Sequence, residues 1–148
     1  MTNHETEIRN ALTKYEALLR SQLERVERIN TAGDAVDYTK LDKITIGVCG
    51  GDGIGPIITD ASAKVLEYLL ADDVKRGRIV FKHIDGLTIE NRAAHMQAIP
   101  DDVMAELKSC DVILKGPTTT PRAGDPWPNI ESANVAMRKA LDLYANVR

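Results

Sequence analysis

Residues 43–56 constrain the fold of this chain more than any other segment. Lys43-Ile-Thr-Ile-Gly-Val-Cys49 is a short apolar run rich in β-branched residues, which is typical of a strand covered on both faces. Gly50-Gly-Asp-Gly-Ile-Gly55 then predicts a tight turn, and Pro56 suits the first position of a helix that runs to about Leu70. A strand, a glycine-rich turn and a helix in succession are typical of a parallel α/β sheet.

The rest of the chain repeats this alternation of strands and helices. The expected elements are strands at 78–84 and 110–114, helices at 88–96, 100–108 and 132–141, a long loop at 115–130, and the start of a further strand at 143–147. The fold class is therefore predicted to be α/β, with a mostly parallel sheet flanked by helices.

Residues 4–30 carry a different pattern. Large apolar residues recur there at three- and four-residue steps, and charged residues fill the opposite face. The apolar positions are Ile8, Leu12, Tyr15, Leu18, Leu19, Leu23, Val26 and Ile29. We expect this amphipathic helix to pack on its own domain, with a partner-binding or oligomerisation helix as the alternative. A helix stop at 30–34 and a linker at 31–42 divide the chain into parts 1–42 and 43–148.

Composition excludes two classes of partner. Nineteen Lys and Arg against 22 Asp and Glu give a net charge of −3, which argues against a general nucleic-acid binder. No apolar run reaches the roughly 18 residues that a membrane-spanning helix needs, and the N-terminus lacks the pattern of a secretory signal.

Cys49 and Cys110 both fall in predicted strands, so we expect reduced core thiols in a cytoplasmic protein. The three histidines, His4, His83 and His95, have no metal-ligand spacing.

The glycine turn by itself leaves two interpretations open. It lacks the third glycine of a dinucleotide-binding fingerprint, because Pro56 follows Gly55, and it lacks the Lys-Ser/Thr pair of a P-loop. One interpretation is a structural turn that needs positive φ angles and close backbone packing. The other is a turn that lines a ligand cleft at the carboxyl edge of the sheet.

A second motif predicts recognition of a small acid with several carboxylates. Ser132, Asn134 and Arg138 lie within seven residues, and Arg148 follows ten residues later. A guanidinium is a planar, permanently charged fork that matches a carboxylate in bidentate fashion. Two such forks beside short hydrogen-bonding side chains suit a polycarboxylate.

Three motifs together resemble the isocitrate and isopropylmalate dehydrogenases, a family of metal-dependent, β-decarboxylating, nicotinamide-linked enzymes. They are Gly51-Asp-Gly-Ile-Gly-Pro56, Leu114-Lys-Gly-Pro-Thr-Thr-Thr-Pro121 and Ser132-Ala-Asn-Val-Ala-Met-Arg-Lys-Ala-Leu-Asp-Leu-Tyr-Ala-Asn-Val-Arg148. The resemblance covers about residues 43–148 and implies the N-terminal portion of that family's large domain, with an extra N-terminal helix. Ile57, where the family usually has an acidic residue, and a longer loop at 124–129 depart from the pattern.

The resemblance implies binding roles. Ser132, Asn134, Arg138 and Arg148 would bind a tricarboxylate substrate, Thr119 and Thr120 would approach NAD or NADP, and Lys115 would shape the pocket. The Ser/Asn pair favours isocitrate, because the isopropylmalate branch presents an apolar surface near this position. The implied reaction oxidises isocitrate and releases carbon dioxide to give 2-oxoglutarate, a step of the tricarboxylic acid cycle.

The resemblance places the catalytic machinery elsewhere. The catalytic tyrosine, a lysine donated across the dimer and the aspartates that bind Mg or Mn are expected after Arg148, so we expect the 148-residue chain alone to be inactive. Tyr144 precedes the position of that tyrosine and is expected to pack in the core. An exposed sheet edge would favour a truncated enzyme over a self-sufficient module. The alternatives are a non-catalytic regulatory subunit, a tricarboxylate-binding module, a structural fragment without a ligand, and an isopropylmalate or homoisocitrate dehydrogenase.

Overall fold

The computed structural model describes residues 3–31 and 36–147, which fall into two compact units, Met1–Tyr38 and Thr39–Arg148. The first unit contains helix α1 (Asn3–Thr31). This confirms the helix expected at 4–30, and its eight large apolar side chains are all exposed. Part of the expected linker, 32–35, lies outside the described residues, and Tyr38–Lys40 form a single 3-10 turn.

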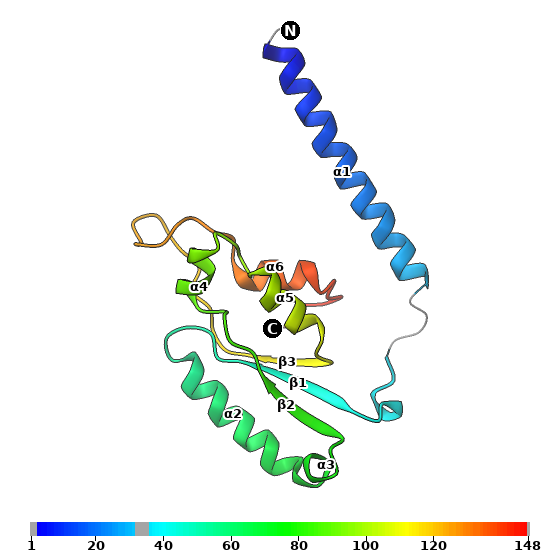
Figure 1. The fold of residues 1–148 in the computed structure, drawn as a ribbon, viewed down its shortest axis with the longest axis vertical. Coiled ribbons are helices and arrows are strands. Elements are labelled where there is room, and N and C mark those ends of the chain that lie inside the picture. Colours follow the sequence, from blue (N-terminus) through cyan, green and yellow to red (C-terminus); the bar gives the residue numbers. More distant parts are fainter. Residues whose placement is uncertain (1–2, 32–35, 148) are drawn as a thin grey trace. The chain divides into compact units, whose positions relative to one another are not determined.

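The second unit is built on a three-stranded parallel sheet (Figure 1). Strand β1 (Ile44–Cys49) lies in the centre, between β2 (Ile79–His83) and β3 (Val112–Lys115). In the β1–β2 pairing Ile44 lies beside Ile79, and in the β1–β3 pairing Ile46 lies beside Val112. The predicted α/β class is therefore confirmed.

Side chains of β1 alternate between two apolar layers because successive residues of a strand point to opposite faces. Ile46 and Val48 pack with Ala63 of α2 (Gly55–Leu69), while Cys49 packs with the opposite cluster. That second cluster contains residues of α5 (Asp101–Lys108) and α6 (Ala133–Ala140). Figure 1 shows α2 on one side of the sheet and α5 and α6 on the other. The two short helices α3 (Ala71–Lys75) and α4 (Ile89–Ala94) complete the unit.

The strand predicted at 110–114 is confirmed as β3 (Val112–Lys115), whereas the placement of Cys110 within it and the strand at 143–147 are wrong. Cys110 lies before β3, because its N–H closes the end of α5 by donating to the Leu107 carbonyl at 3.2 Å, and the residue is only partly buried. Residues 143–147 form no strand, since Asp142 adopts a positive φ of 50° and turns the chain away at the end of α6. Tyr144, expected in the core, is fully exposed.

The other cysteine behaves as expected. Cys49 is completely buried in β1, and burial raises the pKa of its thiol to about 11. The thiol therefore stays protonated and packs as a small apolar side chain. Within the described parts of the chain, no helix combines the length and apolar character needed to cross a membrane.

The glycine turn fits its structural interpretation. Gly51 and Gly53 have φ angles of +72° and +58°, in the left-handed region that favours glycine. A Cβ atom at Gly51 would overlap the Pro117 carbonyl oxygen, whereas a Cβ at Gly53 would meet nothing within 4 Å. The loop after β3 therefore packs directly on the backbone of the turn.

This difference between the two glycines predicts unequal costs of substitution. Gly53→Ala should lower the free energy of unfolding by about 1 kcal/mol, because only the left-handed conformation is penalised. Gly51→Ala should cost at least about 3 kcal/mol, because strain and a backbone clash add. Urea unfolding of both variants measures the difference, and equal losses would contradict the contact with Pro117.

Candidate functional site

Three loops follow the carboxyl ends of the three strands, and the half-buried carboxylate of Asp52 joins them. Its Oδ1 accepts a hydrogen bond from the Ile89 N–H at 2.7 Å, and its Oδ2 accepts one from the Thr119 N–H at 2.6 Å. The Asp52 N–H donates to the Pro117 carbonyl at 2.8 Å. One charge thus fixes the glycine turn against the loops that follow β2 and β3.

Arg92 of α4 makes the second connection between loops. Its side chain is completely buried, and its guanidinium donates to three backbone carbonyls. These belong to Ala98 at 2.7 Å, Thr119 at 2.7 Å and Glu131 at 3.1 Å. Burial lowers the pKa of Arg92, and the charge of Asp52 acts in the opposite direction. Asp52 and Arg92 therefore hold Thr119 by its N–H and its carbonyl, and Arg92 also ties down the residue before Ser132.

The predicted cofactor residues lie on this braced loop. Thr119 is half-buried and Thr120 is exposed. The Lys115 ammonium turns back onto its own loop and donates to the Gly116 carbonyl at 2.8 Å and to the Thr118 hydroxyl at 3.1 Å. Burial lowers the pKa of Lys115. Lys115 is the last residue of β3, Thr119 and Thr120 lie on the loop that follows, and the Lys115 ammonium supports that loop.

Two of the predicted substrate residues share a cavity. Asn134 and Arg138 lie one turn apart on α6 and line a cavity of about 240 Å³. Met137, Leu143 and Asn146 complete its lining. The Arg138 Nε donates to the Asn134 carbonyl at 3.1 Å, which orients the half-buried guanidinium along the helix. The cavity therefore combines a fixed cation and amides with an apolar wall.

The other two predicted substrate residues, Ser132 and Arg148, are not among the described residues that line this cavity. Ser132 occupies the N-cap position of α6, where its carbonyl accepts from the Val135 and Ala136 N–H groups. Its hydroxyl makes no capping hydrogen bond to the helix. Ser132 is absent from the lining of the Asn134–Arg138 cavity, so the structure does not place all candidates in one pocket. Arg148 lies outside the described residues.

The glycine turn lines a second cavity, of about 330 Å³. Its walls come from the turn, from the start of α2 and from the segment after β2, and they include Gly50, Gly51, Asp60 and Asp85. The turn thus packs closely on the β3 loop and also borders a cavity, and ligand binding in that cavity stays a prediction. Such a position at the carboxyl edge of an open α/β sheet is where ligands bind in this class of fold.

The described residues do not form a metal centre. In the two described stretches, no group of three or more His, Cys, Asp or Glu side chains could hold a metal ion. Of the histidines, His95 contacts the Asn91 carbonyl through Nδ1 at 2.8 Å.

Sequence reasoning missed both Asp52 and Arg92. In the sequence, Asp52 was noted only as part of a glycine-rich turn. Its position there could have predicted a role in ordering the loops, because Asp in turns often accepts hydrogen bonds from nearby backbone N–H groups. Arg92 had no such signal. Its three acceptors are spread over 98–131 and come together only in the folded chain.

Comparison with known proteins identifies the fold family. The family profile described as isocitrate/isopropylmalate dehydrogenase matches residues 45–148. The chain belongs to this family. The predicted resemblance over about 43–148 is thereby confirmed.

Individual relatives include both branches of the isocitrate/isopropylmalate dehydrogenase family. The chain is 34% identical to 3-isopropylmalate dehydrogenase from Staphylococcus saprophyticus over 98 residues, covering 66% of this chain and 28% of the relative. It is 38% identical to the isocitrate dehydrogenase [NADP] of Archaeoglobus fulgidus over 98 residues, covering 66% of this chain and 22% of the relative. The chain therefore spans about a quarter of the length of these relatives.

A solved structure gives the same result. The apo form of a β-decarboxylating dehydrogenase from Thermococcus kodakarensis matches with a TM-score of 0.56 and 31% identity, covering 68% of this chain and 27% of that one. The family fold is therefore shown by both sequence and structure.

Arg92→Lys tests the buried connection. Lysine keeps the charge but cannot reach three carbonyls at once, so the free energy of unfolding should fall by about 2–4 kcal/mol. The matched control is Arg76→Lys, on a surface arginine that bonds Asp73 at 2.9 Å, and it should change stability by less than about 0.5 kcal/mol. Urea unfolding followed by fluorescence of Trp127, the single tryptophan, measures both. Similar losses in the two variants would show that Arg92 does not brace the loops.

Proposed function

We propose that this chain supplies part of the substrate site of a nicotinamide-linked, metal-dependent dehydrogenase that oxidises and decarboxylates isocitrate. The observation that carries the proposal is the cavity on α6, where Asn134 and Arg138 present an amide and a cation to the same space. Both residues belong to the motif that resembles the substrate segment of the family.

The proposed binding chemistry is simple. Arg138 donates charge-assisted hydrogen bonds to a substrate carboxylate, each worth about 1.5–3 kcal/mol net. Asn134 adds an amide on the same helix face, and the Ser132 hydroxyl lies at the N-terminus of α6, where the helix dipole favours negative charge. Arg148 is proposed as the second guanidinium.

The bracing by Asp52 and Arg92 supports a positioning role for the β3 loop. Thr119 is held through both of its backbone polar groups, so its loop can present a defined surface to a nicotinamide cofactor, NAD or NADP. The cofactor would accept the hydride, and Mg or Mn would polarise the reacting oxygen. The described residues bind and orient, and turnover by the 148-residue chain alone is not expected.

An isopropylmalate-type substrate is the second candidate. Met137 and Leu143 line the same cavity and offer an apolar wall, and isopropylmalate dehydrogenases occur among the relatives. Isocitrate is preferred because the polar Asn134 would be left unpaired against an alkyl group, which costs binding energy.

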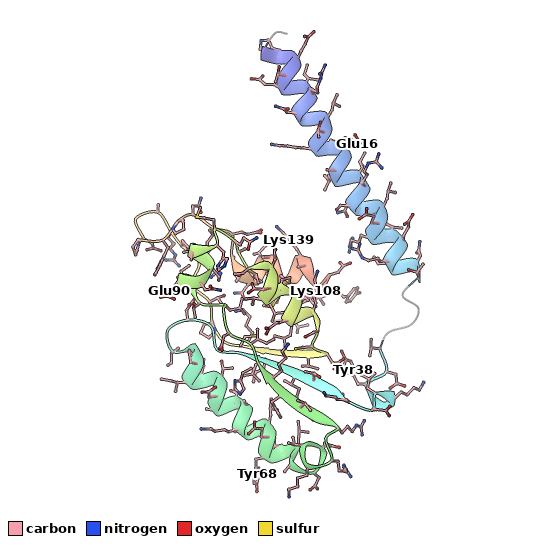
Figure 2. All side chains as sticks on the ribbon, viewed as in Figure 1. Glu16, Tyr38, Tyr68, Glu90, Lys108 and Lys139 are labelled. Atoms are coloured by element: carbon pink, nitrogen blue, oxygen red, sulfur yellow. The ribbon has the colours of Figure 1, made fainter. Side chains whose placement is uncertain are left out.

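Isothermal titration of isocitrate into the chain tests the substrate assignment. Arg138→Ala should weaken binding about tenfold or more, through the loss of charge-assisted hydrogen bonds. Lys139→Ala is the matched control, because Lys139 projects from the same helix (Figure 2) but pairs with Glu131 at 2.6 Å. Binding that Arg138→Ala leaves unchanged, or that the control weakens equally, would exclude the assignment.

The choice between substrates has its own test. Asn134→Leu should weaken isocitrate and strengthen isopropylmalate, each by about tenfold, because the side chain changes from an amide to an apolar surface. Competition titrations with both acids measure the ratio. If the parent chain binds isopropylmalate more tightly than isocitrate, the proposed preference for isocitrate is wrong.

A further inference from the structure

Helix α1 carries an apolar surface that follows a heptad repeat. Leu12, Leu19 and Val26 recur every seven residues, and Ile8, Tyr15, Gln22 and Ile29 form a second series three residues after the first. These series occupy the a and d positions of a coiled coil, and Leu18 and Leu23 widen the surface at g and e. A seven-residue apolar repeat favours a left-handed supercoil with another helix.

The apolar side chains of this surface are exposed. Its eight large apolar side chains are between 45% and 64% exposed, and α1 lies outside the segment that matches the dehydrogenase family. Burying one large apolar side chain is worth about 1.5–3 kcal/mol at about 25 cal/mol per Å², which corresponds to roughly 60–120 Å². The apolar side chains of α1 together would therefore bury roughly 500–1,000 Å² per helix. That range includes the about 800 Å² per partner of a stable protein–protein interface.

We propose that α1 joins copies of this chain through a parallel, in-register coiled coil. This interface is independent of the proposed dehydrogenase activity and of any contact made by the second unit.

The charges of α1 permit such self-pairing. The helix has five acidic and five basic residues, so two copies do not repel each other through net charge. Its acidic residues are Glu5, Glu7, Glu16, Glu24 and Glu27, and its basic residues are Arg9, Lys14, Arg20, Arg25 and Arg28. Glu16, labelled in Figure 2, pairs with Arg20 of its own helix at 2.7 Å, so this charge has a partner within one copy.

The polar residue in the repeat selects the orientation. In a parallel, in-register pair Gln22 meets Gln22 of the second copy, and the two amides can bond each other. In an antiparallel pair an a position faces a d position, so Gln22 would lie against a leucine or valine and leave its amide unpaired.

Light scattering on the full chain during size exclusion tests the proposal. The parent should have at least twice the monomer mass of 16.3 kDa at concentrations of tens of micromolar. Leu19→Glu, in the centre of the surface, should give a monomer, whereas the matched control Ala17→Glu, on the opposite face, should keep the mass of the parent. A monomeric parent, including one that binds lipid vesicles through α1, would overturn the proposal. So would an assembly that Leu19→Glu leaves intact.

Two further variants distinguish a change in assembly from a loss of folding. In Gln22→Leu, the concentration at which the assembly dissociates should fall by about tenfold or more, because an apolar layer replaces a polar one. Gln22→Cys should form a disulfide between copies on mild oxidation, because identical positions face each other only in the parallel register. A Gln22→Leu variant that dissociates more readily than the parent would overturn the proposed register, and so would a Gln22→Cys variant that crosslinks no faster than the parent.

Discussion

The carboxylate of Asp52 is the constraint on which the carboxyl edge of this sheet depends. Parallel strands deliver three loops to one edge, and nothing in the sheet itself fixes those loops relative to one another. Asp52 does so through hydrogen bonds to the N–H groups of Ile89 and Thr119 and through its own N–H to Pro117. Charge-assisted bonds of this kind are about twice as strong as neutral ones, so one side chain can order three segments.

Arg92 extends the same principle into the interior. Its burial is favourable only because each side of the guanidinium has a backbone acceptor, and an unpaired buried cation would cost several kcal/mol. The acceptors at Thr119 and Glu131 lie on both sides of the loop that separates the predicted cofactor residues from α6. Asp52 and Arg92 thus determine where the two segments proposed to bind cofactor and substrate lie, without belonging to either.

The parts that sequence predicted and the parts that it missed have different physical origins. β1, α2 and α5 follow from local signals, namely an apolar β-branched run, Pro56 at a helix start and acidic residues in a first turn. The end of α6 depends on the backbone conformation of Asp142, for which an apolar stretch at 143–147 gave the wrong expectation. Of the site, Asn134 and Arg138 were predicted from their closeness in one short segment and from the family resemblance, and in the structure they lie one turn apart on α6. Arg92 was missed because its partners are distant in the sequence.

The cavity on α6 illustrates what the proposed substrate binding requires from the surrounding framework. When a cation on an exposed helix binds a ligand, its side chain loses conformational entropy, and solvent weakens the attraction by screening the charge. Arg138 avoids part of this cost, because its bond to the Asn134 carbonyl orders the guanidinium before a ligand arrives. Holding α6 in turn requires that the segment before Ser132 stay in place, which Arg92 ensures through the Glu131 carbonyl. The proposed specificity of the α6 motif therefore depends on a buried arginine that no ligand has to touch.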